Sequence, residues 1–409
     1  MLKRISVRHL TVGMYLKEFC GSWMEHPFLR SSFVIRDAQE ITAILASSIK
    51  EVWIDTAKGR DVQPDEPATS TAVAGTEVHT ELTGATSEQS DLVPVIAAAE
   101  FARAARIVAH SRQAVASMFE EARLGKVVDT GGAQRLVQEI SDSVSRNAGA
   151  LISLARLKTA DDYTYLHSVA VCALMLALAR QLALDEQQTR QAGIAGLLHD
   201  LGKAAMPIEV LNKPGKLTDA EFAIIRSHPE AGYRMLCGAD GVDPVTLDVV
   251  LHHHEKTDGS GYPAHLEDGQ ISLFARMAAV CDVYDAITSN RPYKAGWDPA
   301  ESLRKMAEWS TGHFDPRVFQ AFVKSIGIYP IGSLVLLSCG RLGVVIEQGA
   351  GSLLTPQVKV FFSTRSGARL RPEVINLGQP ACPFRIVSRE DPAKWNFPDL
   401  NEMWCGRPG

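Results

Sequence analysis

Histidine and aspartate residues that could bind metal ions gather in the middle of this 409-residue chain. Half of its twelve histidines fall between residues 167 and 254. The candidates are His167, the adjacent His199 and Asp200, His228, the run His252-His253-His254, and Asp282. A mixture of imidazoles and carboxylates favours a first-row ion such as iron or manganese over magnesium, which prefers oxygen ligands. The sequence therefore predicts a metal site built from several separate segments.

The pair His199 and Asp200 is central to this prediction. It follows an apolar stretch typical of a buried helix, and Gly202 and Lys203 come shortly after it. Neighbouring side chains on a helix point about 100° apart, so this pair suits two metal ions bridged by the carboxylate better than a single ion. Any one buried histidine is more often a hydrogen-bonded core residue. The whole set is hard to explain that way, because each buried polar group would need its own partners.

The composition is that of a globular chain. Hydrophobic residues make up 46% and charged residues 22% of the sequence, and the formal net charge is −5. This charge argues against a partner that is a nucleic acid polymer bound through a broad basic surface. The seven cysteines form no CxxC motif, which is typical of a reducing compartment. The most apolar helical stretch, residues 169–184, is too short for a transmembrane segment, so we expect a cytoplasmic protein.

A chain of this length is expected to form two or three domains. Short strands and one helix predict a small N-terminal α+β domain over residues 1–60. Residues 61–92 are rich in small and polar residues and predict a flexible linker. Helical periodicity predicts a connector over residues 93–139 and a helical bundle over residues 140–328. β-prone runs separated by glycines predict a small C-terminal β-barrel-like domain over residues 329–409. The fold class we expect is therefore multidomain and mainly α-helical.

Local signals predict several helix ends. Two capping boxes, two aspartates that precede prolines, and one terminal glycine are recognisable. They are Asp37 with Glu40, Thr218 with Glu221, Asp298, Asp315 and Gly327. The first box predicts a helix over residues 41–49. Apolar residues spaced by three and four between residues 136 and 154 predict a stripe that packs on another helix or on a second subunit, so a homodimer through the long helices is a hypothesis.

The series of motifs as a whole resembles the HD-GYP family. This family is a branch of the HD metal-dependent phosphohydrolases and hydrolyses the bacterial second messenger cyclic di-GMP. The resemblance covers about residues 140–330 and also rests on Asp258-Gly-Ser-Gly-Tyr-Pro263 and Arg291-Pro-Tyr293. It implies an HD-type bundle for residues 140–328. Residues 1–60 and the helix after the linker resemble the domain of unknown function that often precedes HD-GYP modules, mainly through Gly13, Met14 and residues 23–28.

The resemblance implies which residues bind metal. The expected ligands are His167, His199, Asp200, His228, His253, His254 and Asp282, with Asp200 bridging two ions. His252 is then an extra histidine outside the ligand set. Some members bind a third metal through a glutamate one helical turn before the first histidine, and here that position is Tyr163. We therefore expect two divalent ions, iron or manganese, rather than three.

The resemblance also implies a substrate-binding surface. Gly261, Tyr262 and Pro263 would form a tight loop, with the Tyr262 ring stacked on a guanine or touching phosphate. Arg291 and Lys294 would bind a phosphate or a guanine edge.

The expected catalytic residues are Asp200 and Lys203. A metal-activated hydroxide would attack the phosphodiester, and Lys203 would help to neutralise the charge that develops. Asp285, one turn beyond Asp282, would orient a metal ligand.

Our main hypothesis is a phosphodiesterase that opens cyclic di-GMP to linear pGpG, with slower cleavage on to GMP as an extension of the same reaction. A hydrolase of another cyclic dinucleotide is the enzymatic alternative. A catalytically weak module that binds cyclic di-GMP and signals through a flanking domain is the alternative from a different functional class. The complete set of metal ligands favours an enzyme.

Overall fold

The computed structural model describes residues 2–20, 33–45, 50–62, 68–70, 97–157, 163–213, 215, 217–289, 296–349 and 352–405. The chain divides into two compact units, residues 1–84 with 304–313 and residues 85–303 with 314–409. Most of the predicted linker, the predicted motif at residues 23–28, and Arg291 and Lys294 lie outside the described residues. The domain boundaries expected from the sequence remain predictions.

The first unit contains an antiparallel five-stranded sheet and helix α1 (Ala38–Leu45). The strands are β1 (Leu2–Ser6), β2 (Tyr15–Cys20), β3 (Phe33–Val34), β4 (Glu51–Asp55) and β5 (Ala68–Ser70), in the order β3-β2-β4-β1-β5. Ile5 of β1 and Val52 of the central strand β4 pair with each other, and Ile44 of α1 joins them in the core. This arrangement confirms the predicted α+β region.

Helix α1 begins earlier than predicted. Asp37 caps it by accepting a hydrogen bond from the Glu40 amide at 2.9 Å, which confirms that Asp37 is the capping residue. The Glu40 carboxylate reaches back to the Arg36 amide at 2.7 Å, one residue before the usual partner in a capping box. The predicted start at residue 41 was therefore too late by one turn, because a helix begins directly after its capping residue.

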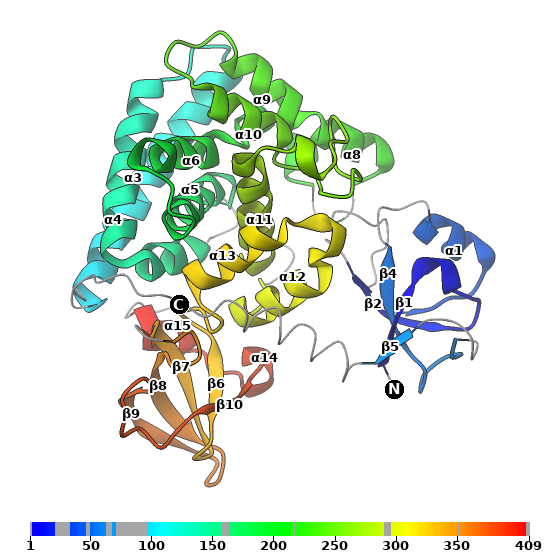
Figure 1. Ribbon diagram of the computed structural model, residues 1–409, viewed down its shortest axis with the longest axis vertical. Helices are drawn as coiled ribbons and strands as arrows, with labels where there is room; N and C mark the ends of the chain where they lie inside the picture. The colour runs from blue at the N-terminus through cyan, green and yellow to red at the C-terminus, as the bar shows by residue number, and fades with distance from the viewer. Residues whose placement is uncertain are drawn as a thin grey trace. The chain divides into compact units, whose positions relative to one another are not determined.

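The second unit is mainly a helical bundle (Figure 1). Its long helices are α3 (Ala97–Arg123), α4 (Thr130–Arg156), α5 (Tyr163–Gln181), α6 (Glu186–Leu198), α11 (Leu273–Thr288), α12 (Pro299–His313, shared with the first unit) and α13 (Pro316–Ile326). Its shorter helical segments are η3 (Leu201–Ala205), α7 (Ile208–Leu211), α8 (Asp219–Arg226), α9 (His228–Leu236), α10 (Pro244–His252) and η4 (Asp268–Gln270).

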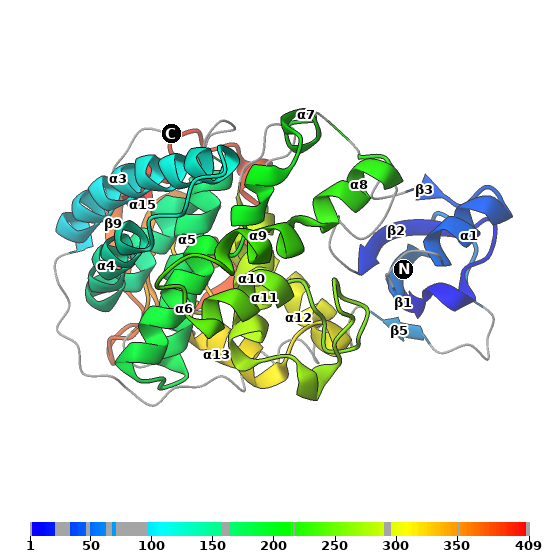
Figure 2. The ribbon, with the colours of Figure 1, turned by 90° about the horizontal axis from the view of Figure 1, so that it is seen from above.

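Helix α5 lies inside this bundle, in contact with α3, α4, α6, α11 and α13 (Figures 1 and 2). Every residue from 166 to 179 is buried. Among the described residues, α5 is the one helix long and apolar enough to cross a membrane, and 78% of its apolar window is buried within the protein. This burial is what a core helix requires, since a helix that is apolar on all sides needs neighbours on all sides.

The long apolar stripe predicted between residues 136 and 154 is covered within the chain. Helix α4 carries it, and α4 packs against α3 and α5. Glu100 of α3 is fully buried and accepts hydrogen bonds from Arg146 of α4 at 3.0 and 3.1 Å and from Ser143 at 3.1 Å. The backbone of α4 leaves the helical conformation at Asn147, where the helix is kinked. The stripe therefore has intramolecular partners and does not by itself require a second subunit.

The other predicted caps are confirmed. Thr218 and Glu221 exchange the two hydrogen bonds of a capping box at 2.7 and 3.3 Å. Asp298 accepts from the Glu301 amide at 2.9 Å, and Asp315 caps α13. Gly327 ends α13 with φ +83°, a conformation that favours glycine.

The C-terminal part forms an antiparallel sheet in the order β10-β6-β7-β8-β9. Its strands are β6 (Leu334–Leu337), β7 (Arg341–Glu347), β8 (Gln357–Ser363), β9 (Ala368–Asn376) and β10 (Ile386–Arg389), followed by α14 (Pro392–Trp395) and α15 (Leu400–Cys405). Val335, Val345 and Val358 lie in its core, as their β-prone runs predicted. The barrel-like closure was wrong for the described residues: β9 and β10 are edge strands with one neighbour each, whereas a barrel requires the edges to pair.

Candidate metal centre

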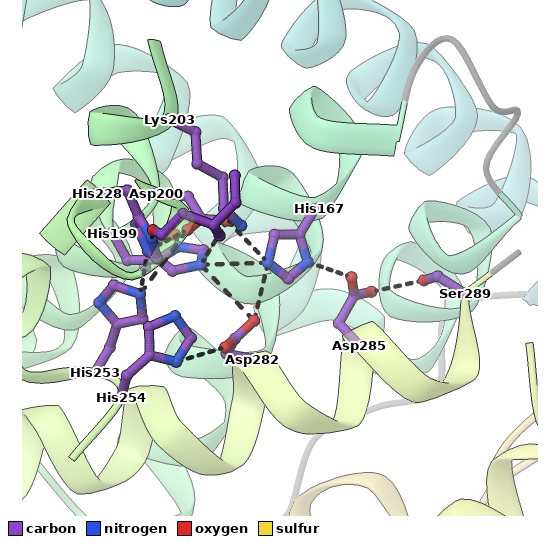
Figure 3. A network of polar contacts seen from close by, with 12 residues as sticks. His167, His199, Asp200, Lys203, His228, His253, His254, Asp282, Asp285 and Ser289 are labelled. Carbon is purple, nitrogen blue, oxygen red and sulfur yellow. Dashed lines mark hydrogen bonds and ion pairs between the residues drawn. The ribbon is translucent and has the colours of Figure 1, made fainter. Parts of the chain in front are cut away.

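Seven side chains converge in the second unit (Figure 3). They come from α5 (His167), the turn after α6 (His199, Asp200), the start of α9 (His228), the end of α10 (His253, His254) and α11 (Asp282). Six are buried and His254 is largely so, its side chain being 13% exposed. Two groups of possible ligand atoms each lie within 4.8 Å of one another, one of Asp200, His228, His253 and His254 and one of His167, His199 and Asp282. The structure thus brings together all seven ligands expected from the sequence.

Asp200 lies between the two groups. Its Oδ1 is 3.1 Å from His228 Nε2 and 3.8 Å from His253 Nε2. Its Oδ2 is 3.3 Å from His167 Nε2 and 3.4 Å from His199 Nε2. One oxygen therefore faces each group, as a bridging carboxylate must.

Asp282 also faces both groups. Its Oδ1 is 3.0 Å from His167 Nε2, and its Oδ2 is 3.8 Å from His254 Nδ1. Sequence spacing did not indicate this second connection.

Three imidazoles are oriented by the backbone of their own helical turns. Each directs Nδ1 at a carbonyl oxygen: His199 at Gly196 (2.9 Å), His228 at Ile225 (2.7 Å) and His253 at Val250 (3.1 Å). A carbonyl can only accept, so Nδ1 carries the hydrogen and a neutral ring presents the Nε2 lone pair to the centre. His228 Nε2 and His253 Nε2 lie only 3.2 Å apart. Two lone pairs this close repel each other unless a cation or a proton lies between them.

The Asp200 carboxylate gives an independent test of whether metal ions fit. Its Oδ1 is buried and accepts no hydrogen bond from a described residue. The 3.1 Å approach of His228 Nε2 does not change this, because the hydrogen of that ring is on Nδ1. An ionised oxygen buried without a donor is costly unless a cation compensates it. The donor set of imidazole nitrogens and carboxylate oxygens therefore fits divalent first-row metal ions.

The expected protonation states of His253, His254 and Asp200 agree with this fit. Burial lowers the pKa of His253 well below its ordinary value, as do the neighbouring imidazoles, and burial lowers the pKa of His254 to about 3. Burial alone would raise the pKa of Asp200, but Lys203 and the adjacent imidazoles hold it well below its ordinary value. Neutral imidazoles and an ionised carboxylate are the forms that bind metal.

His167 differs from the other histidines because carboxylates surround it. Burial lowers its pKa, yet Asp200, Asp282 and Asp285 together raise it to about 10. Its Nδ1 is 2.6 Å from Asp285 Oδ2, and Asp285 Oδ1 accepts from Ser289 at 3.2 Å (Figure 3). Asp285 therefore holds the His167 ring with Nε2 directed at the other ligands, the position expected for an orienting carboxylate.

Close backbone approach makes this convergence possible. A Cβ on Gly202 would lie 1.9 Å from the His228 carbonyl oxygen and 2.5 Å from the Gly232 nitrogen. On Gly196 it would lie 3.1 Å from the Cys172 Cα of α5. Glycines thus allow the turn after α6 to lie directly against α9 and α6 to lie against α5. The Lys203 ammonium contacts Asp200 Oδ2, so a positive charge lies at the centre (Figure 3).

The predicted substrate loop packs against the turn that carries His254. Gly261 lies so close to the preceding turn that its Cβ would be 2.5 Å from Glu255 Cα. Glu255 anchors the loop by accepting hydrogen bonds from the Ala264 and Leu266 amides at 2.7 and 3.1 Å.

Tyr262 has two close neighbours in the loop. Its ring stacks against the His254 imidazole, with centroids 4.7 Å apart and planes at 27°. The Arg226 guanidinium lies 4.5 Å from the centroid of the same ring. Sequence reasoning missed Arg226, because α8 and the loop are distant in sequence and no motif marks the arginine.

The remaining predicted residues take peripheral positions. His252 is in neither ligand group, and its Nδ1 lies 3.8 Å from Glu255 Oε1. The Tyr163 ring stacks on His167, with centroids 5.9 Å apart and planes at 7°.

Known proteins are similar to this chain over nearly its full length or over part of it. Residues 140–318 match the HD domain family, and residues 2–133 match a domain of unknown function, DUF3391. The cyclic di-GMP phosphodiesterase PA4108 of Pseudomonas aeruginosa is 53% identical over 407 residues, 99% of this chain and 96% of that protein. The cyclic di-GMP phosphodiesterase response regulator RpfG of Xanthomonas campestris pv. campestris is 38% identical over 47% of this chain and 51% of its own length. The 3'3'-cGAMP-specific phosphodiesterase 1 of Vibrio cholerae is 36% identical over 40% of this chain and 38% of its own length.

Proposed function

We propose that this chain, which belongs to the HD-GYP family of HD-domain phosphodiesterases, hydrolyses cyclic di-GMP to linear pGpG. The observation that carries the proposal is the position of Asp200, with one carboxylate oxygen facing each of two groups of buried ligands. The full-length similarity to PA4108 supports the substrate.

We assign the seven converging side chains as the ligands of two divalent ions, iron or manganese. Held by these residues, such ions would supply Lewis-acid chemistry, lowering the pKa of water to make it a nucleophile near neutral pH and offsetting the charge of the phosphate. The choice of metal rests on the five imidazoles, which suit these ions better than magnesium. Two ions rather than three follow from Tyr163, whose ring stacks on His167 where a third-site glutamate would be needed.

The residues of the chain have separate tasks in this reaction. Asp200 holds the two ligand groups in register, and Asp285 fixes the orientation of His167 through the 2.6 Å contact. Lys203 places a positive charge beside Asp200 and so offsets negative charge that develops on the phosphate. Gly261 and Pro263 shape the loop that positions Tyr262 at the edge of the centre. Arg291 and Lys294 remain assigned to phosphate or guanine by family resemblance alone.

Purified protein loaded with iron or manganese without oxygen tests this function. We expect it to convert cyclic di-GMP to pGpG, with GMP appearing later, as measured by chromatography and mass spectrometry. The double variant His199→Ala with Asp200→Ala should lose turnover and metal, while His252→Ala, outside both ligand groups, should retain both. Turnover by the double variant at the normal rate would contradict the assigned centre.

A hydrolase of another cyclic dinucleotide is the alternative that the comparisons support. The 3'3'-cGAMP-specific relative is 36% identical to this chain over 40% of the chain's length. Competition between cyclic di-GMP and 3'3'-cGAMP at equal concentrations decides between them, because the preferred substrate has the larger kcat/KM. A catalytically weak binding module is disfavoured by the complete ligand set and would show tight binding without turnover.

We further propose that the enzyme is cytoplasmic and that the domain boundaries are those expected from the sequence. A homodimer through the long helices is a further proposal, and it would use the part of α4 that α3 and α5 leave uncovered. Sedimentation of the full chain at micromolar concentration measures its mass directly.

A further inference from the structure

Arg226 is a cation near the metal centre that has no role in the assignments above. It is the last residue of α8 and precedes His228 by two positions, so the chain passes directly from Arg226 into the ligand-bearing helix α9 (Figure 2). Its side chain is half-buried. The guanidinium lies 4.5 Å from the centroid of Tyr262 and 6.0 Å from that of Phe222.

Tyr262 connects this guanidinium to the metal centre. Its ring stacks on His254 at 4.7 Å, and its amide donates to the His254 carbonyl at 3.2 Å. His254 in turn directs Nδ1 towards Asp282, 3.8 Å away. The Tyr262 ring therefore contacts both the Arg226 guanidinium and a candidate ligand imidazole.

The N–H groups of Arg226 are not engaged by the described part of the chain. Arg146 and Arg276 pair with Glu100 and Asp315, whereas Arg226 forms no ion pair or side-chain hydrogen bond with a described residue. Contact with an aromatic face fixes the position of a guanidinium but leaves the donors along its edge available. A fixed guanidinium with available donors is suited to bidentate binding of a phosphate.

We propose that Arg226 binds the phosphodiester of the cyclic dinucleotide that is not being cleaved. This inference rests on the proposed function, and its reasoning is electrostatic. A cyclic dinucleotide carries two negatively charged phosphodiesters, and the metal centre can engage only one of them at a time. A cation at the border of the site would offset the charge of the second, and Arg226 provides one at the end of α8, in addition to Arg291 and Lys294, which resemblance assigns to phosphate or guanine. Tyr262 then acts by holding Arg226 beside His254.

Three substitutions separate charge from packing. Arg226→Ala removes both, Arg226→Met keeps an extended side chain on Tyr262 without charge, and Arg226→Lys keeps a positive charge. We expect Ala and Met to raise KM for cyclic di-GMP about 10- to 100-fold, the usual value of a hydrogen bond to a charged group. They should also raise the Kd of a non-hydrolysable phosphorothioate analogue by the same factor, with kcat and metal content unchanged. Lys should restore part of the loss. Arg234→Ala, an exposed arginine on α9, is the matched control and should change nothing.

Several results would overturn the proposal. Normal KM and Kd in Arg226→Met would show that the side chain only packs on Tyr262. Loss of metal in Arg226→Ala and in Arg226→Met would show a structural role. Cyclic di-AMP keeps both phosphodiesters but lacks the guanine edges, so an Arg226→Ala effect on cyclic di-GMP that is absent for cyclic di-AMP would reassign Arg226 to guanine. Wild-type protein that binds the analogue but cleaves no cyclic di-GMP contradicts the proposed function instead, and the Kd values still decide the role of Arg226.

Discussion

Adding a single methyl group at Gly202 should disrupt the metal centre although no ligand side chain is replaced. A Cβ there would lie 1.9 Å from the His228 carbonyl oxygen and 2.5 Å from the Gly232 nitrogen, whereas real Cβ atoms stay at least 3.0 Å from such neighbours. Both neighbours are backbone atoms and cannot rotate away. The turn that carries Asp200 must therefore move from α9 by about 1 Å, and shifts of about 1 Å at a reacting centre can lower rates about 100-fold.

The assay compares Gly202→Ala with Gly238→Ala, since nothing lies within 4 Å of a Cβ at Gly238. We expect Gly202→Ala to lose kcat by about 100-fold on cyclic di-GMP. Its metal content should fall, and overpacking should lower its free energy of unfolding by about 1–3 kcal/mol. Gly238→Ala should match the wild type in all three measurements. Full metal content and a kcat within threefold of wild type in Gly202→Ala would refute the reasoning that close packing of η3 on α9 positions Asp200.

Further predictions concern the support of the centre and of the bundle. Asp285→Asn should weaken metal binding about 10- to 100-fold, because the amide can no longer offer His167 a charged acceptor, and a competition assay with a chelator would contradict this by giving the wild-type affinity. Glu100→Ala should destabilise the bundle by about 1–3 kcal/mol in chemical denaturation, because the part-buried Arg146 loses its charged hydrogen-bond acceptor; a loss below about 0.5 kcal/mol would disprove that role. Burial raises the pKa of Glu100, but Arg146, Ser143 and Arg103 together lower it overall, so the stabilisation should be complete above the unfolded pKa near 4.5 and be lost as pH falls below it; Glu100→Gln should show a weaker dependence on pH in that range. Elemental analysis should find two metal ions per chain, and three would show that Tyr163 does not exclude the third site.

The sequence alone was sufficient where the interactions are local. Capping boxes join residues three positions apart, so Thr218 and Glu221 could be paired without knowing the fold. The β-prone runs of residues 334–363 were likewise recognisable from their own residue types. In the structure they are the antiparallel strands β6, β7 and β8. Whether the edge strands pair with each other depends on residues far apart in the sequence. The barrel expected there is an open sheet.

The chemical inventory of the metal centre was also present in the sequence. Seven ligand candidates could be listed because imidazoles and carboxylates are rare in apolar segments and costly to bury without a purpose. Their order along the chain then matched a known family. What the list could not contain was the division of the ligands into two groups.

Only the tertiary structure decided which groups face one another. His167 and Asp285 are 118 positions apart, and their 2.6 Å contact depends on how α5 packs on α11. The same is true of Asp282, which faces both ligand groups, and of Arg226, which reaches the Tyr262 ring from another helix. Residue types limit what a site can bind, but distances between its atoms arise from packing across the whole bundle, and no local pattern encodes them.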